Sequence, residues 1–253
     1  MSPAMNYAHL ADLYDTYVHT KRDIPFFSQE ADNISGEALE LMAGTGRVTL
    51  PLLKQGVRLT CVDLYPQMLA VLEAKASVQG LQVETHAMDV SELNLGKQFA
   101  FIFIPFNAFA EISSTSDQMK ALIRIHQHLA PEGLFICTLH NPQVRLSRVD
   151  GQLRLWGNFP RHDQPGRLLL WGLENYHPES EQVEGVQIFE LYDEQGVLET
   201  KRMSEIHFSI LERDQFEQLT QKAGFKIAAL YGDYDYSPFS EESSPFMIWK
   251  LYR

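Results

Sequence analysis

One segment near the start of the chain restricts its possible folds more than any other. Residues 38–42 form a mostly apolar run that contains Glu40, a turn of small residues follows over 43–46, and a helical pattern covers 48–55. A buried strand, a tight turn and a helix, in that order, are typical of the first unit of a parallel α/β sheet. Glycines allow such a turn to bend sharply and to approach a ligand without a Cβ in the way. Because open α/β sheets bind ligands at the carboxyl ends of their strands, this turn is the first candidate binding site.

The alternation of strand-like and helix-like patterns continues to about residue 140. Further strands are predicted over residues 57–63, 82–86, 99–104 and 134–139, and further helices over residues 66–79 and 118–129. The run 99–104 is almost wholly apolar, as is typical of a central strand that is buried on both faces. We therefore expect an α/β fold with a doubly wound, mostly parallel sheet whose core begins with residues 31–141.

The pattern changes after residue 141. Alternating runs separated by turns that contain Pro and Gly predict an antiparallel β-meander, with strands over residues 168–176, 182–192 and 197–208. A helix over 212–223 and strands over 225–231 and 246–252 then restore the α/β pattern. The expected domains are an N-terminal helical cap, a core in two pieces and a meander insertion, over residues 1–30, 31–141 with 210–253, and 142–209 respectively.

Two more acids follow the next two predicted strands. Asp63 ends the second strand, where a carboxylate can accept hydrogen bonds from both hydroxyls of a ribose. Asp89 follows the third strand and suits an adenine amino group, or alternatively caps the next helix. With Glu40, these acids should converge on one edge of the sheet. They suit a ligand with a cationic end better than the pyrophosphate of NAD, whose fingerprint also needs a third glycine where this chain has Thr49.

Residues 38–140 resemble class I S-adenosylmethionine-dependent methyltransferases. The resemblance rests on five motifs in the order of the family, at residues 40–52, 62–69, 88–90, 103–109 and 128–134. It implies a seven-stranded Rossmann-like sheet, S-adenosylmethionine as cofactor and S-adenosylhomocysteine as product. It also implies in-line transfer of the methyl group, driven mainly by positioning and exclusion of water. A non-catalytic, S-adenosylmethionine-binding regulatory or scaffold protein is the first alternative, and an NAD-dependent oxidoreductase is the second.

The resemblance assigns roles to individual residues. Glu40 would face the amino group of the methionine moiety, Asp63 would hold the ribose, and Tyr14 would cover the site. The family usually has glycine where this chain has Met42. The complete set of implied cofactor-binding residues is Tyr14, Glu40, Met42, Ala43, Gly44, Gly46, Asp63, Leu64, Met68, Met88, Asp89, Val90, Pro105 and Phe106.

Candidate catalytic residues lie where strand ends and the cap should meet. His140 follows the fifth predicted strand and Asn107 the fourth, whereas Tyr14 and Tyr17 belong, with Tyr7, to an N-terminal aromatic set that would shield the methyl group. Each has a purely structural alternative: helix capping or solvent exposure for His140, a turn for Asn107 and packing for the tyrosines. Glu111 also follows the fourth strand, with a solvated helix position as its alternative. A general base is needed only if the acceptor arrives protonated.

Charge and motifs narrow the class of acceptor. The net charge is −12 and the longest basic cluster has two residues, so the chain lacks the basic stripe typical of a nucleic-acid binder. Residues 104–107 differ from the Asn/Asp-Pro-Pro-Tyr motif of enzymes that methylate DNA adenine or protein glutamine. We expect a small, partly aromatic or apolar acceptor with an N or O nucleophile. The meander would be a lid or wall beside it, or alternatively a dimerisation surface.

Other features concern location and assembly. The longest apolar stretch is too short to span a bilayer, and the first seven residues lack the pattern of a signal peptide. Cys61 and Cys137 lie in apolar segments, which favours reduced core thiols and a cytoplasmic protein. The histidines show no metal-ligand spacing, so no metal site is expected. A monomer and a homodimer are both compatible with the sequence.

Overall fold

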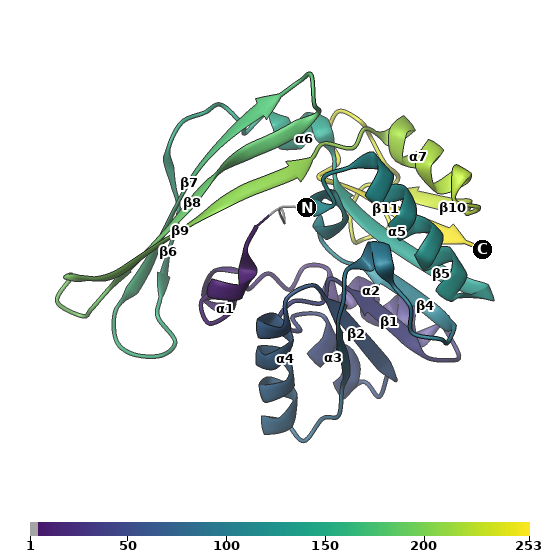
Figure 1. Cartoon of the computed structure of the whole chain (residues 1–253), viewed down its shortest axis with the longest axis horizontal. Coiled ribbons are helices and arrows are strands. Elements are labelled where there is room, and N and C mark those ends of the chain that lie inside the picture. Colours follow the sequence, from purple (N-terminus) through teal and green to yellow (C-terminus); the bar gives the residue numbers. More distant parts are fainter. Residues whose placement is uncertain (1–4) are drawn as a thin grey trace.

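The computed structural model describes residues 5–253, which fold into two β-sheets with flanking helices (Figure 1). The larger sheet has seven strands in the order β10-β11-β5-β4-β1-β2-β3. The strands are β1 (Ala38–Leu41), β2 (Leu59–Asp63), β3 (Glu84–Ala87), β4 (Phe99–Ile104), β5 (Leu129–His140), β10 (Lys226–Tyr231) and β11 (Phe246–Tyr252). Strands β1 to β5 pair in parallel, and β11 pairs antiparallel with both β5 and β10. The predicted doubly wound, mostly parallel sheet is therefore confirmed.

Helices cover both faces of this sheet, because alternate side chains of each strand point to opposite sides. In β4, Phe101 and Phe103 join one apolar core while Ile102 and Ile104 join the other. The first core also receives side chains from α2 (Ile24–Asp32), α3 (Thr49–Lys54) and α4 (Pro66–Val78). The second receives them from α5 (Thr115–His128) and α7 (Arg213–Lys222). The central strands are thus buried from both sides, as their apolar sequences predict.

Strand β5 is longer than its apolar run. It begins at Leu129 instead of residue 134, so the predicted turn over 131–133 lies inside the strand. The register explains this difference, because Phe99 pairs with Leu129 but Phe101 pairs with Leu134. The additional residues form an irregularity of the kind that breaks the alternation on which the sequence prediction relied.

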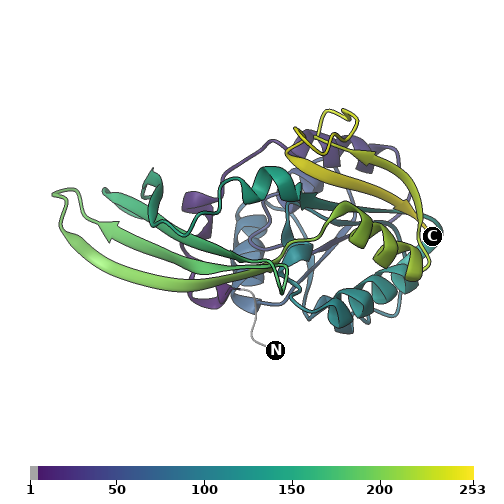
Figure 2. The same ribbon diagram turned by 90° about the horizontal axis from the view of Figure 1, so that it is seen from above.

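The second sheet is antiparallel, with the order β6-β7-β8-β9. Its strands are β6 (Arg154–Pro160), β7 (Arg167–His177), β8 (Gln182–Tyr192) and β9 (Leu198–Ser209), and α6 (Pro142–Leu146) leads into them from β5. Figures 1 and 2 show this sheet extending away to one side of the core. The sequence predicted three of the four strands. It missed β6, which is mostly exposed and carries a bulge between Leu155 and Gly157 that obscures its period.

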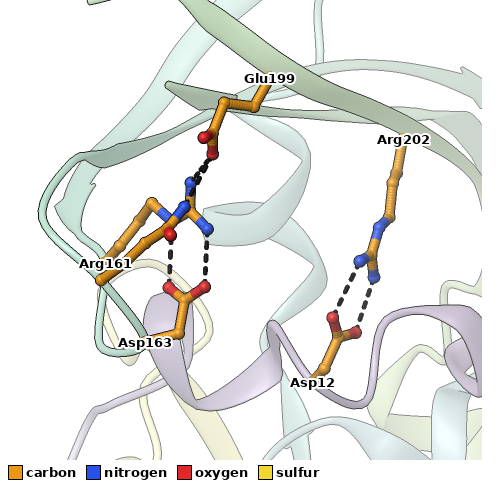
Figure 3. Close-up of polar contacts among 6 residues, drawn as sticks. Asp12, Arg161, Asp163, Glu199 and Arg202 are labelled. Carbon is orange, nitrogen blue, oxygen red and sulfur yellow. Dashed lines mark hydrogen bonds and ion pairs between the residues drawn. The ribbon is translucent and has the colours of Figure 1, made fainter. Parts of the chain in front are cut away.

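The N-terminal segment lies between the two sheets and contains only short helices, η1 (Tyr7–His9) and α1 (Tyr14–Tyr17), before α2. Residues 1–4 of the predicted cap lie outside the described residues. The guanidinium of Arg202 on β9 donates to both carboxylate oxygens of Asp12, at 2.6 and 2.8 Å (Figure 3), and to the carbonyl oxygen of His9 at 2.8 Å. On the other side, Asp15 accepts a 2.6 Å hydrogen bond from Thr45 Oγ1. The segment is therefore fixed to both sheets.

Among residues 5–253, no helix combines the length and apolar character that crossing a membrane requires. Within the same range, no three His, Cys, Asp or Glu side chains gather into a cluster that could hold a metal ion. Cys61 and Cys137 are both buried free thiols, packed as the sequence predicts for core residues.

Candidate functional site

A cavity of about 290 Å³ lies at the carboxyl ends of β1, β2 and β3. This volume is near the lower end of the range for small-molecule sites, roughly 300–1,000 Å³. Its lining comes from five parts of the chain: the N-terminal segment, the turn after β1, the loops after β2 and β3, and the stretch after β4 from η3 (Ala108–Glu111) to the start of α5. The parallel sheet brings these segments together, because the carboxyl ends of its strands share one edge.

Asp63 connects the turn after β1 to the end of β2. One of its carboxylate oxygens accepts a 2.7 Å hydrogen bond from the amide of Gly44, and the other accepts a 2.9 Å bond from the amide of Tyr65. Burial raises the pKa of Asp63 above its ordinary value, although these amides oppose the shift. Asp63 also lines the cavity, where its remaining lone pairs can accept hydrogen bonds. It therefore combines a structural role in the turn with a position at the cavity.

The two glycines of the turn are needed for different reasons. Gly44 lines the cavity with φ of +58°, and a Cβ built on it would stand 3.6 Å from Met68 Cε. Gly46 has φ of +85° and does not line the cavity; a Cβ there would collide with the side chain of Leu72 on α4. Gly46 therefore allows the turn to pack against α4, which corrects its expected place beneath the ligand.

Met42 adopts a backbone conformation that favours glycine. Its φ is +57°, in the left-handed region that costs an L-residue roughly 1–2 kcal/mol. This explains why a glycine is usual at this position in the family that the sequence resembles. The methionine side chain lines the cavity, so the strained backbone carries an apolar group at the site. Ala43, next to it, donates its amide to Val62 O at 3.0 Å and does not line the cavity.

Glu40 does not reach the cavity, which corrects its expected place facing a ligand amino group. Its side chain is buried, and one carboxylate oxygen accepts a 2.6 Å hydrogen bond from Thr49 Oγ1. Burial raises the pKa of Glu40 to about 8, so the group is mostly protonated at neutral pH. Thr49 occupies the position where the NAD-binding fingerprint has its third glycine. Its hydroxyl donates a hydrogen bond to Glu40 here.

The wall formed after β2 and β3 is mostly apolar. Leu64 and Met68 line it from one loop and helix, and Met88 and Val90 line it from the next loop. Asp89 lies between the latter two and accepts a 2.8 Å hydrogen bond from the amide of Ser91. The two readings of Asp89 from the sequence are therefore compatible, since it caps η2 (Val90–Glu92) and also lines the cavity.

Two of the four predicted catalytic residues, His140 and Asn107, lie outside this cavity. Asn107 Oδ1 accepts a 2.8 Å hydrogen bond from the backbone amide of His140. The two residues line a separate space of only about 10 Å³. Burial lowers the pKa of His140 to about 4, so its ring is neutral at physiological pH. These positions support structural roles, a turn for Asn107 and packing for His140, whose ring lies against Phe106 and Phe246.

The other two predicted catalytic residues are neighbouring tyrosines. Tyr14 lines the cavity, and its ring lies 5.5 Å from that of Tyr17. Tyr17 itself lies behind it, 5.1 Å from Phe189 on β8, and is not a lining residue. Burial raises the pKa of both hydroxyls above the ordinary tyrosine value, so neither is a base at neutral pH.

Pro105 and Phe106, expected beside the cofactor, do not line the cavity either. Phe106 has φ of +62°, is 40% exposed and lies under the guanidinium of Arg47, which is 5.8 Å from the ring centroid. Arg47 is held by a bidentate ion pair with buried Asp23. This part of the fourth motif therefore packs against the end of the turn after β1, outside the cavity.

Two residues that the sequence analysis named without a firm role, Tyr7 and Glu111, meet at this cavity. The hydroxyl of Tyr7 donates a 2.9 Å hydrogen bond to Glu111 Oε1, and both residues line the cavity. Burial raises the pKa of Glu111 to about 7, with a further contribution from the charge of Asp63. The sequence indicated Glu111 only as an acid that closely follows a central strand, near the carboxyl edge of the sheet.

Aromatic rings surround this pair. The ring of Tyr7 lies 5.8 Å from those of Tyr14 and Tyr65, and both contacts are edge-to-face. Burial raises the pKa of Tyr65 to about 12 and that of Tyr7 well above its ordinary value. The tyrosine hydroxyls are therefore neutral donors, and the ring faces offer an environment that suits a cation.

The charged residues that line the cavity are all acidic. Asp63, Asp89 and Glu111 line it together with Asp117, which is paired with Lys120 at 2.8 Å. Among the described residues, the lining contains no lysine, arginine or histidine. The cavity therefore attracts positively charged ligands and disfavours anions.

Comparison with known proteins agrees with this geometry. Residues 38–133 match a protein-family model described as a methyltransferase domain. A putative methyltransferase of Geobacillus sp. (strain WCH70), GWCH70_2453, is 26% identical over 223 residues, which cover 84% of this chain and 83% of the relative.

Solved structures share the whole fold. The CcbJ methyltransferase from Streptomyces caelestis has a TM-score of 0.81 at 20% identity, covering 96% of this chain and 95% of its own. The sugar N-methyltransferase KedS8 from Streptoalloteichus sp. has a TM-score of 0.74 at 15% identity, covering 95% and 91%. At such identities the likeness establishes the fold, including the four-stranded insertion.

Proposed function

Because this chain is a class I S-adenosylmethionine-dependent methyltransferase, we propose that it transfers the methyl group to an amine nitrogen of a small molecule. The acidic lining of the cavity carries this proposal. A protonated amine is attracted by Asp63, Asp89 and Glu111, whereas a carboxylate or phenolate acceptor would meet like charge. The tyrosine rings beside Glu111 add a second feature that favours cations.

The residues of the cavity fit the cofactor. Asp63 offers acceptors for ribose hydroxyls, Asp89 suits the adenine amino group, and Gly44 leaves open the space that a Cβ would fill. The apolar wall that packs against the adenosine comprises Leu64, Met68, Met88 and Val90. When bound, S-adenosylmethionine supplies a methyl group already activated by its sulfonium. The protein must then mainly position the acceptor and exclude water, which Tyr7 and Tyr14 do as the roof of the cavity.

Structural relatives support an amine acceptor. KedS8 is a sugar N-methyltransferase, CalS10 is an amino pentose methyltransferase and MtfA is a glycopeptide N-methyltransferase. These proteins share the fold at 15–20% identity. Amines on small polar scaffolds are therefore the first acceptors to test.

The four-stranded sheet has a supporting role in this proposal. Phe189 on β8 contacts Tyr17, and Arg202 on β9 holds Asp12 and the carbonyl oxygen of His9. Both contacts are made with the N-terminal segment, which covers the cavity with Tyr7 and Tyr14. We infer that the insertion acts as a wall that fixes this roof, in keeping with the lid or wall expected from the sequence.

Isotope-labelled transfer tests the proposal. The protein is incubated with [methyl-13C]S-adenosylmethionine and matched acceptors, D-glucosamine against D-glucose and benzylamine against benzyl alcohol. We expect N-linked 13C-methyl products, identified by mass spectrometry and 13C NMR, only with amines. Transfer to the alcohols alone, or cofactor binding without transfer to any of the four, would overturn the proposal.

A further inference from the structure

We infer that Glu111 is the general base that removes a proton from the acceptor ammonium, and that Tyr7 is the positioning residue that orients its carboxylate. The inference rests on the proposed function, since only a protonated amine must lose a proton before its nitrogen can attack. It also supplies a catalytic residue inside the cavity, which the candidates His140 and Asn107 do not line.

The hydrogen bonding of Glu111 leaves one oxygen available. Tyr7 donates to Oε1 at 2.9 Å, and Oε2 accepts no hydrogen bond from residues 5–253. The side chain lines the cavity from η3, the short helix that follows β4. A partly buried carboxylate with one oxygen fixed and the other open has the geometry of an oriented base. Because Tyr7 is itself neutral, it can orient the group without competing for the proton.

The groups around Glu111 set its proton affinity. Tyr7, Tyr14, Tyr17, Tyr65 and Asp63 interact with Glu111 electrostatically. Asp89 after β3 and Asp117 at the start of α5 are the other acids of the same cavity. Burial is the largest influence on the pKa of Glu111, the Tyr7 hydrogen bond lowers it and the charge of Asp63 raises it, with a net pKa of about 7. A base with a pKa near the working pH is the most effective in proton transfer.

The proposed step is balanced. The ammonium nitrogen gives one proton to Oε2 of Glu111, which becomes a neutral carboxyl, and keeps the N–H bonding pair as a lone pair. That pair forms the new N–C bond to the methyl group while the C–S bond breaks and its electrons return to sulfur. The methylated nitrogen carries a positive charge again, and ring faces such as those of Tyr7 and Tyr14 suit this cation. Glu111 returns its proton to water once the products leave.

The first test compares Glu111→Gln with Glu92→Gln, which changes an exposed acid in η2 outside the cavity lining. The acceptor is whichever of D-glucosamine and benzylamine the wild type methylates faster. At pH 7 we expect Glu111→Gln to lose roughly 100-fold or more in kcat, as removal of a general base typically does, with its Kd for S-adenosylmethionine within threefold of wild type. The deficit should shrink as pH rises, because more free amine then binds without needing a base. Glu92→Gln should match wild type.

The second variant, Tyr7→Phe, removes only the orienting hydrogen bond. Because that bond lowers the pKa of Glu111, its loss should move the acid limb of the kcat profile to higher pH while activity persists at high pH. A purely structural role for Tyr7 would lower activity equally at all pH values.

The outcomes separate the two proposals. If wild type methylates neither amine, the proposed function fails and the base role fails with it. If wild type methylates an amine and Glu111→Gln keeps its rate or its pH profile, the base role alone is overturned. Loss of cofactor binding in Glu111→Gln would also overturn it, by showing that Glu111 belongs to the cofactor site.

Discussion

The hydroxyl of Tyr7 donates a 2.9 Å hydrogen bond to Glu111, and this bond connects the N-terminal segment to the end of β4 across 104 residues. It places a neutral donor beside a partly buried carboxyl group, and both groups line the cavity. The N-terminal segment therefore does more than cover the site, because it orients the group that we assign as the base. Other features of the site lead to four further predictions.

Asp63→Asn should weaken both cofactor binding and folding. The carboxylate accepts hydrogen bonds from Gly44 and Tyr65, whereas an amide nitrogen cannot accept the bond that it would replace. One buried amide then loses its partner, which costs about 1–3 kcal/mol of unfolding free energy. We expect at least a tenfold increase in Kd for S-adenosylmethionine by isothermal titration, with denaturant unfolding measured alongside. Undiminished affinity would contradict the ribose-binding role.

Glu40→Gln should make stability less dependent on pH. Burial raises the pKa of Glu40 from 4.5 to about 8, so folding favours its protonated form. Its contribution to stability is fully present below about pH 4.5 and is lost as pH rises towards about 8. Glutamine can still accept from Thr49 and never ionises. The variant should therefore gain stability relative to wild type between pH 5 and pH 8.5 in chemical unfolding, and a constant difference would exclude a raised pKa.

Met42→Gly should be more stable than Met42→Ala. Both changes remove the same side chain from the cavity lining, but only glycine relieves the positive φ of +57°. The difference in unfolding free energy should be roughly 1 kcal/mol in favour of glycine, as the steric penalty of the left-handed region implies. Equal stability of the two variants would mean that this backbone conformation is not retained.

Arg202→Gln should make the N-terminal segment, which covers the cavity, more mobile, with little change in global stability. Its ion pair with Asp12 is partly exposed, and such pairs contribute about 0–1 kcal/mol. One kcal/mol corresponds to roughly a fivefold shift in the opening equilibrium of the segment. We expect faster amide hydrogen exchange in residues 5–17 and a KM for S-adenosylmethionine raised up to about fivefold.

Arg161→Gln is the matched control for this change. Arg161 forms ion pairs with Asp163 and Glu199 of the same sheet, and neither partner belongs to the N-terminal segment (Figure 3). It should leave exchange in residues 5–17 and the KM at wild-type values. If both arginine variants behave alike, the sheet acts through general stability and not through the Asp12 contact.

The sheet was predictable because its central strands are mostly apolar runs and helical patterns separate the first three strands. The cavity positions of Gly44, Asp63 and Asp89 followed from the rule that parallel strands share a carboxyl edge. The orientation of Glu40 did not follow, since an acid inside a strand can point to either face, and here it points to Thr49 in the core. Strand β6 was missed because its exposed side chains and bulge remove the alternating pattern.

The acceptor side of the site was harder to predict. Tyr7 and Glu111 meet only in the folded chain, and nothing near either residue in the sequence indicates the other. The position of His140 at the end of β5 suggested a catalytic role, but its ring packs against Phe106 and Phe246. For a residue at or after the end of a strand, the sequence position alone does not determine the direction of its side chain.

The central claim is that the methyl group is presented to an acceptor amine beside Glu111. A crystal structure with sinefungin tests it most directly, because sinefungin carries an amine in place of the transferring methyl group. We predict that one ordered water bridges this amine and Oε2 of Glu111 by hydrogen bonds. That water would occupy the position of the acceptor nitrogen. An amine that faces another wall, with protein atoms between it and Glu111, would contradict the account.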